Sequence, residues 1–302
     1  MIMPRAEGYR DKDETVSARR LPKPWEDIMP VLAMTREMGS GGREVAHRVA
    51  DQVGLTLILH ELVEHDLAEH LHVPDSTIHH RLEGGAKLRE RLQVGSKRLA
   101  RYTAEEILDL ANRGNVLIRG WGASVILRDV PHVARVRVCA SKEIRERTVM
   151  ERSGLDRTAV RREIERNDAA HKRTLQAAYG VDPEDPALYD LVLNTDRTSI
   201  ETCVKLICDL IASPEFQETE ASRAILNDKT LEAHIRIKLR EHFTTGMGVT
   251  GIEATVNGGK VSLAGTAIHS ALAEDASKIV HEVPGVKEVV NRMVVVHGPR
   301  AL

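Results

Sequence analysis

The chain has 302 residues, 42% of them hydrophobic and 29% charged, which is long enough for two domains that each bury a core. A net charge of -2 and an aromatic content of 3% argue against a nucleic-acid-binding protein, which would need a basic surface or stacking platforms. Three cysteines without CxxC spacing predict neither a disulfide framework nor a zinc ribbon, and no apolar run approaches the ~18 residues of a membrane span. We therefore expect a cytoplasmic protein without integral membrane association, and the sequence leaves its oligomeric state open.

The N-terminal part begins with a charged segment, residues 1–29, that we expect to be a flexible arm. The apolar run Val31–Thr35 then predicts a buried strand. A turn, Gly39-Ser40-Gly41-Gly42, leads into a helix whose valines and alanines recur at helical spacing until Gly54. A strand, a glycine turn and a helix in this order can present backbone N–H groups and a helix N-terminus to a phosphate.

Residues 30–213 contain further apolar runs that are separated by helical segments. Thr103-Ala-Glu-Glu106 has the spacing of a capping box, and Gly114 stands where a helix would end. Buried strands separated by helices predict an α/β fold, a parallel sheet with helices on both faces. The runs predicted as strands are Leu55–Leu59, Val116–Ile118, Val133–Cys139 and Tyr189–Asn194.

The C-terminal part follows a polar segment, residues 214–225, that we interpret as a linker. Asp228–Phe243 has helical periodicity, and two alternating runs around Asn257-Gly258-Gly259 predict a β-hairpin. A second amphipathic helix ends at Pro284-Gly285, and a valine-rich strand follows over Val286–Val296. Residues 226–299 therefore predict a small α+β domain with the order αββαβ.

The glycine turn differs from the P-loop pattern GxxxxGK[ST]. With Gly42 as the last glycine, Glu37 stands at the first glycine, Arg43 at the lysine and Glu44 at the hydroxyl position. The motif alone leaves two interpretations open, a nucleotide site and a tight strand-to-helix turn that needs glycine for its backbone.

Three segments in order resemble the cytidylate-kinase-like family, a divergent branch of the P-loop nucleoside monophosphate kinases. They are TREMGSGGREVAHRVADQVG, NVLIRGWGASVILRDVPHVARVRVCASKEIRERTVMER and REIERNDAAHKRTLQAAYGVDPEDPALYDLVLNTDRTSIE. The resemblance implies a P-loop kinase fold that transfers a phosphoryl group from ATP to a nucleoside monophosphate such as CMP, with Mg²⁺. It implies a nucleotide or a small anionic ligand as the partner.

The resemblance also implies site residues. Phosphate-binding candidates are Gly39, Ser40, Gly41, Gly42, Arg43 and Glu44, and Glu44 is also the candidate Mg²⁺ ligand. Catalytic candidates are Arg43 and the lid arginines Arg147, Arg166 and Arg173, with Arg152 in the same stretch. Acceptor-binding candidates are Arg119, Trp121 and Asp168. Interleaved acids leave a solvated helix face open as the alternative for each lid arginine.

Several of these positions depart from the family pattern. Trp121 stands where relatives carry an arginine that helps to bind the monophosphate, and Glu37, Arg43 and Glu44 depart from the P-loop. A second hypothesis is therefore a catalytically impaired P-loop domain that acts as a nucleotide or anion sensor.

The segment Leu226–His297 resembles a BON domain through VTGIEATVNGGKVSLAGTA and VPGVKEVVNRMVV. The resemblance implies a small ligand or a phospholipid surface as its partner. Its basic and acidic residues nearly balance, so no polybasic attraction to anionic lipid is expected, and a regulatory or ligand-binding role is favoured.

A histidine-rich segment, HELVEH at 60–65, departs from both HExxH and HxxEH. We favour a solvated helix surface over a metal site there.

Overall fold

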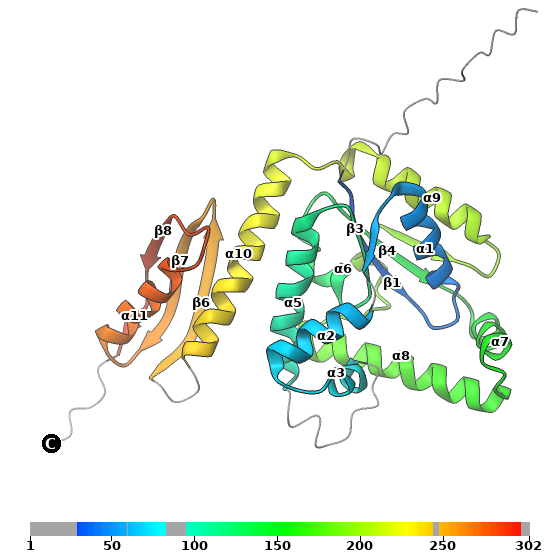
Figure 1. Cartoon of the computed structure of the whole chain (residues 1–302), viewed down its shortest axis with the longest axis horizontal. Coiled ribbons are helices and arrows are strands. Elements are labelled where there is room, and N and C mark those ends of the chain that lie inside the picture. The colour runs from blue at the N-terminus through cyan, green and yellow to red at the C-terminus, as the bar shows by residue number, and fades with distance from the viewer. Residues whose placement is uncertain (1–28, 59, 83–94, 244–247, 297–302) are drawn as a thin grey trace, which may run out of the picture.

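The computed structural model describes residues 29–58, 60–82, 95–243 and 248–296 (Figure 1). The arm expected over 1–29 therefore lies outside the described residues, except for Met29.

The N-terminal part is built on a five-stranded sheet with the order β2-β3-β1-β4-β5. Every neighbouring pair of these strands is parallel, which confirms the predicted α/β class. The strands are β1 (Val31–Arg36), β2 (Thr56–Ile58), β3 (Val116–Arg119), β4 (Val133–Cys139) and β5 (Leu191–Asn194). Parallel neighbours need a crossover between them, and the helices that follow each strand provide it.

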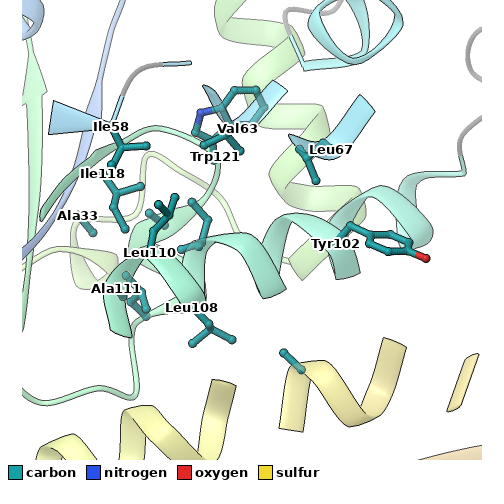
Figure 2. Close-up of a cluster of buried hydrophobic side chains, with 14 of the residues drawn as sticks. Ala33, Ile58, Val63, Leu67, Tyr102, Leu108, Leu110, Ala111, Ile118 and Trp121 are labelled. Carbon is teal, nitrogen blue, oxygen red and sulfur yellow. The ribbon is translucent and has the colours of Figure 1, made fainter. Parts of the chain in front are cut away.

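Two helical layers cover the two faces of this sheet (Figure 1). Successive side chains of a strand point to opposite faces, so Leu32 and Met34 pack on α1 and α9, whereas Val31 and Ala33 pack on the α2 and α5 side. Figure 2 shows the hydrophobic cluster on the α2 and α5 side, in which Ile118 of β3 and Leu110 of α5 lie between the sheet and the helix. The helices are α1 (Gly42–Val53), α9 (Ile200–Ala212), α2 (His60–Leu71), α3 (Asp75–Leu82), α5 (Ser96–Arg113) and α6 (Ala123–Ile126).

The capping box predicted at Thr103 is wrong, because α5 already begins at Ser96. Thr103 lies inside the helix, where its hydroxyl donates to the carbonyl of Leu99 at 2.9 Å instead of capping an N-terminus. The predicted helix end is confirmed, since Gly114 caps α5 with φ of 71°.

Two helices follow β4 and stand beside the sheet (Figure 1). They are α7 (Lys142–Ser153), capped by Ser141, and α8 (Arg157–Tyr179), capped by Asp156. Short 3-10 turns at Pro186–Leu188 and Pro214–Phe216 precede β5 and the helix that begins at Glu220.

The C-terminal part has the predicted αββαβ order. Strands β6 (Val249–Asn257) and β7 (Lys260–Ala267) form the antiparallel hairpin, with Gly258 and Gly259 at φ of 59° and 82° in the turn. After α11 (Ser270–His281), the expected long strand is two pieces, β8 (Glu288–Asn291) and β9 (Val294–Val295), which both pair with β7 in parallel.

The helix α10 (Glu220–His242) joins the two parts and begins at Glu220, inside the predicted linker, rather than at Asp228. A capping box between Thr219 and Ser222 fixes this earlier start. Its predicted apolar face, Leu231, Ile235 and Leu239, packs on the C-terminal sheet. A second apolar face, Leu226, Ala233 and Ile237, packs on α5 in the N-terminal core, so α10 lies between the two parts (Figure 1).

Candidate functional site

A cavity of about 770 Å³ lies at the carboxyl ends of the parallel strands. Its walls come from the ends of β1, β3 and β4 and the residues that follow them, from one side of α8 and from the first turns of α5. Ligands of open α/β sheets bind at this edge, where backbone groups and loops converge. Basic residues outnumber acidic ones in its lining: Arg36, Arg119, Arg137, Lys142, Arg145, Lys172 and Arg173 against Glu37, Glu64, Asp168 and Glu184. The cavity therefore suits an anionic ligand.

The predicted phosphate loop does connect β1 to a helix N-terminus. Gly39 and Gly41 have φ of 82° and 74°, a conformation that side chains with a Cβ rarely adopt, and Gly41 is the N-cap of α1. The hydroxyl of Ser40 is turned inward and donates to the carbonyl oxygens of Glu37 and Val138 at 2.8 and 3.1 Å. The loop is tightly packed, because a Cβ on Gly39 would lie 2.6 Å from the carbonyl oxygen of Arg145. Among the described residues, the cavity lining starts at the Glu37 end of this loop and does not include residues 39–42.

The charged residues at the start of α1 point away from the cavity. Arg43 and Glu44 are both exposed, and neither lines the cavity among the residues described. The carboxylate of Glu44 accepts from Arg48 at 2.5 Å, and Arg48 also contacts Glu201 of α9. The Glu44 side chain remains about half exposed despite this pairing.

The predicted lid arginines separate into two groups. Arg173 lines the cavity from α8. Arg147, Arg152 and Arg166 are exposed and lie outside the cavity lining in the described part of the chain. The physical reason is helix geometry, since each residue turns the side chain by about 100°, and the inward faces of α7 and α8 carry other residues.

A partly buried network of alternating charges, which the sequence analysis did not predict, lies at this end of the sheet. Arg145 of α7 has a side chain only 4% exposed, and its guanidinium donates to both oxygens of Asp168, at 2.9 and 2.6 Å. Its Nε also donates to the carbonyl of Met38 in the glycine loop at 2.7 Å. Asp168, an acceptor-binding candidate, therefore reaches the loop through Arg145.

Glu37 continues this network towards β4. Its Oε1 accepts from Nη2 of Arg137 at 2.6 Å, its Oε2 accepts from the backbone N–H of Ala140 at 3.2 Å, and Nη1 of Arg145 lies 3.6 Å away. Arg137 also donates to the carbonyl of Pro183. One sequence signal for this pair existed, because an arginine between Val136 and Val138 is unusual in a strand expected to be buried on both faces.

The acceptor candidates at the end of β3 and just after it lie in the cavity wall. Arg119 and Trp121 are 7% and 8% exposed, and both line the cavity. Gly120, Trp121 and Gly122 have φ of 90°, 60° and 72°, and a tryptophan at positive φ is strained. The indole also belongs to the hydrophobic cluster of α5 and α2 (Figure 2), so Trp121 both lines the cavity and packs in the core.

Neutral polar groups complete the wall on the α8 side. Burial lowers the pKa of His171 and raises the pKa of Tyr179, so both side chains are uncharged near neutral pH. Glu64 of α2 is buried, also lines the cavity, and contacts Nδ1 of His79 at 3.1 Å. His171 and Tyr179 can offer hydrogen bonds to an uncharged part of a ligand, beside the cationic part of the cavity.

The histidine-rich segment lies on α2, where His65 contacts Asp75 and Glu69 on the surface. Within the described residues, no three His, Cys, Asp or Glu side chains are placed to hold a metal ion together. Magnesium does not need such a cluster, because it is commonly held by one or two carboxylates together with substrate phosphates. No helix of the described ranges is both long and apolar enough to cross a bilayer.

Comparison with known proteins gives two family matches. The model of the cytidylate kinase-like family matches residues 31–197, and the BON domain model matches residues 227–297. The cytidylate kinase of Pyrobaculum calidifontis is 28% identical over 185 residues, which cover 61% of this chain and 94% of that protein. The cytidylate kinase of Methanopyrus kandleri is 30% identical over 183 residues, which cover 57% and 88%.

Solved structures align over the same region. An uncharacterized protein from Eubacterium ventriosum is 22% identical with a TM-score of 0.49, covering 61% of this chain and 98% of that one. Shikimate kinase from Bacteroides thetaiotaomicron is 16% identical with a TM-score of 0.37, covering 61% and 99%.

Proposed function

Because this chain belongs to the cytidylate kinase-like family, we propose that its N-terminal part transfers a phosphoryl group from ATP to a nucleoside monophosphate resembling CMP. The observation that supports this most is the cavity at the strand ends, whose basic lining meets the glycine loop at Glu37 and Arg145. Phosphoryl transfer demands little covalent chemistry from the protein and depends on positioning and on cations around the moving group.

The residues of this chain can meet these demands in distinct ways. Arg145 is held in place by Asp168 and by the loop carbonyl, so its guanidinium is oriented before a ligand arrives. Arg137 and Lys142 line the same cavity and can stabilise the charge on phosphoryl oxygens. Arg119, Trp121 and the neutral groups of α8 would orient the acceptor nucleotide. Mg²⁺, when bound with the triphosphate, would neutralise charge on its oxygens. Glu44 is the ligand that the sequence suggests, but it lies outside the cavity lining and pairs with Arg48, so it would have to leave that pair to hold the ion.

A coupled ADP-release assay tests this function, with ATP and each nucleoside monophosphate in turn, with and without Mg²⁺. We expect Mg²⁺-dependent turnover with a pyrimidine monophosphate. Arg173→Ala should lower kcat/KM by about tenfold or more, because it removes a cavity cation. Arg162→Ala is the matched control, since Arg162 is an exposed arginine of the same helix outside the cavity lining. Equal activity of both variants, or no turnover with any acceptor, contradicts the proposal.

A nucleotide or anion sensor without turnover is the second candidate. Two observations favour it: Glu37 and Asp168 already neutralise Arg137 and Arg145, and the glycine loop is packed against α7. Calorimetric binding of ATP or CMP with no phosphoryl transfer would support the sensor over the kinase.

The BON domain is proposed to regulate the cavity or to bind a small ligand or phospholipid. Support comes from α10, which packs on the C-terminal sheet with one face and on α5 with the other. The first turns of α5 supply Leu99, Ala100 and Thr103 to the cavity wall. A change in nucleotide affinity when vesicles containing phosphatidylglycerol are added to the full chain would support a lipid-linked role, and an unchanged affinity would oppose it.

A further inference from the structure

We propose that Glu37 is an internal competitor for the phosphate subsite of the cavity, and that it selects doubly charged phosphate groups over singly charged anions. This inference rests on the proposed nucleotide function and adds a specificity-determining residue to it. Three donors converge on the Glu37 carboxylate: Nη2 of Arg137 at 2.6 Å, the N–H of Ala140 at 3.2 Å and Nη1 of Arg145 at 3.6 Å. Two guanidinium groups and a backbone N–H around one anion are also the donors that a phosphate requires.

The surroundings show that the carboxylate can leave this position. Glu37 lines the cavity and its side chain is 22% exposed, whereas the side chains of Arg137 and Arg145 are 12% and 4% exposed. The backbone of Glu37 is held independently, because its N–H donates to the carbonyl of Val138 at 3.0 Å and its carbonyl accepts from the N–H of Ser40. Rotation of the Glu37 side chain into the cavity therefore frees the donors without moving the loop.

The two acids of the network differ in this respect. Asp168 makes a paired, two-oxygen contact with the buried Arg145, and that contact orients the guanidinium. Glu37 instead bridges two separate arginines and the backbone N–H of Ala140, with a single oxygen towards each. A ligand that displaces Glu37 gains these donors, but a singly charged anion only replaces one negative charge with another. A phosphate dianion brings more charge to the same donors and wins the competition.

Isothermal titration calorimetry of the full chain with inorganic pyrophosphate, without Mg²⁺, tests this inference. We expect Glu37→Gln to bind pyrophosphate about tenfold tighter than wild type, and to bind acetate that the wild type does not bind measurably. Glu37→Asp keeps the negative charge, but its side chain is too short to bridge Arg137 and Ala140 together. Its pyrophosphate affinity should therefore rise above that of wild type by less than that of Glu37→Gln. Glu184→Gln is the control for a general charge effect, because Glu184 lines the cavity rim and pairs with Lys172 instead.

Each outcome decides the question, once circular dichroism has shown which variants are folded. If Glu37→Gln does not fold, Glu37→Asp is compared with wild type in the same way. If the folded Glu37 variants bind pyrophosphate with the same or a weaker affinity than wild type, Glu37 only holds Arg137 in place. The proposal that Glu37 competes with phosphate is then wrong, even when the wild type binds ATP. An equal gain in Glu184→Gln also overturns it, because the effect is then not specific to Glu37. Failure of wild type and all Glu37 variants to bind pyrophosphate or ATP overturns the proposed function as well.

Discussion

Nε2 of His234 in α10 lies 3.0 Å from Oδ2 of Asp109 in α5, and this contact joins the C-terminal part of the chain to the N-terminal core. Two further contacts along the same interface connect Tyr102 with Glu241 at 2.6 Å and Lys229 with Asp129 at 3.0 Å. Polar contacts therefore flank the apolar face of α10 that packs on α5. This face of α10 therefore belongs to the hydrophobic core of the N-terminal part.

The first prediction is that stability at this interface falls as the pH rises from about 5 to 8. The hydrogen bond to Asp109 raises the pKa of His234 in the folded state. Protonated His234 therefore adds its full contribution to the free energy of unfolding below the ordinary histidine pKa, and this contribution is lost as the pH rises through the raised value. Burial raises the pKa of Glu105, 3.9 Å from His234, from 4.5 to about 7, so the folded state also holds that proton longer than the unfolded chain does. Both effects have the same sign.

Urea unfolding at several pH values between about 5 and 8 checks this slope. His234→Gln should flatten it, and His47→Gln, which changes an exposed histidine of α1, should not. A slope that is identical in wild type and His234→Gln contradicts the assignment.

The second prediction concerns truncation. A chain that ends at Ser213 loses α10 and exposes the surface covered by Leu226, Ala233 and Ile237, so we expect it to lose on the order of 3–5 kcal/mol of unfolding free energy. The polar segment 214–225 and the αββαβ pattern beyond it predict that the N-terminal part folds by itself. The packing of α10 on α5 leads us to expect a less stable truncated chain instead. A chain that ends at Phe243 keeps this helix and should unfold at higher urea concentration. Equal midpoints for the two truncated chains contradict the prediction.

The third prediction concerns the pair that orients Arg145. Asp168→Asn leaves the buried guanidinium without its charged partner, so we expect a loss of about 1–2 kcal/mol of unfolding free energy and at least about tenfold weaker nucleotide binding. Asp182→Asn is the control, because its pair with Lys172 is about half exposed and should change stability by less than about 0.5 kcal/mol. Thermal unfolding and calorimetric titration measure both. If the two variants bind nucleotide with equal affinity, Asp168 has no role in nucleotide binding.

The fourth prediction concerns the contact between α7 and α8. Hydrogen bonds from Arg161 and Arg157 lower the pKa of Glu146 to about 2. Because its pKa is lowered in the folded state, the ionised Glu146 stabilises the fold at pH values above its ordinary pKa of about 4.5. This stabilisation is lost as the pH falls towards 2 and the carboxylate takes up a proton. Glu146→Gln should therefore be less stable than wild type at neutral pH, and the difference should shrink as the solution is acidified from about pH 5. A difference that stays constant with pH would show that the ion pairs contribute nothing.

The fifth prediction returns to Arg43 at the first turn of α1. If the loop binds phosphate, Arg43→Ala should weaken ATP binding by on the order of 1.5–3 kcal/mol, because the helix N-terminus alone supplies only about half a charge. The fold should survive, since the side chain is exposed. Arg43→Lys should restore part of the affinity without the paired geometry of a guanidinium. Unchanged ATP affinity in Arg43→Ala would leave the glycines as a structural turn.

The sequence by itself determined the elements whose signals are local. The glycines after β1, the spacing of Val45, Ala46 and Val49 in α1, and the turn at Gly258 each act within a few residues, and the structure contains all three features as predicted. The α/β class followed from the order of these elements, because parallel strands require intervening helices.

Only the tertiary structure decided which side of each helix faces the cavity. Arg147 was predicted for the site and is exposed, whereas Arg145, two residues earlier, is buried against the glycine loop and Asp168. Interleaved acids and bases gave α7 no periodic signal that separated the two arginines. The second apolar face of α10 was missed for a related reason, because a helix that is apolar on two sides has weak amphipathicity. Burial of a particular side chain depends on what packs against it from distant parts of the chain, and local spacing does not contain that information.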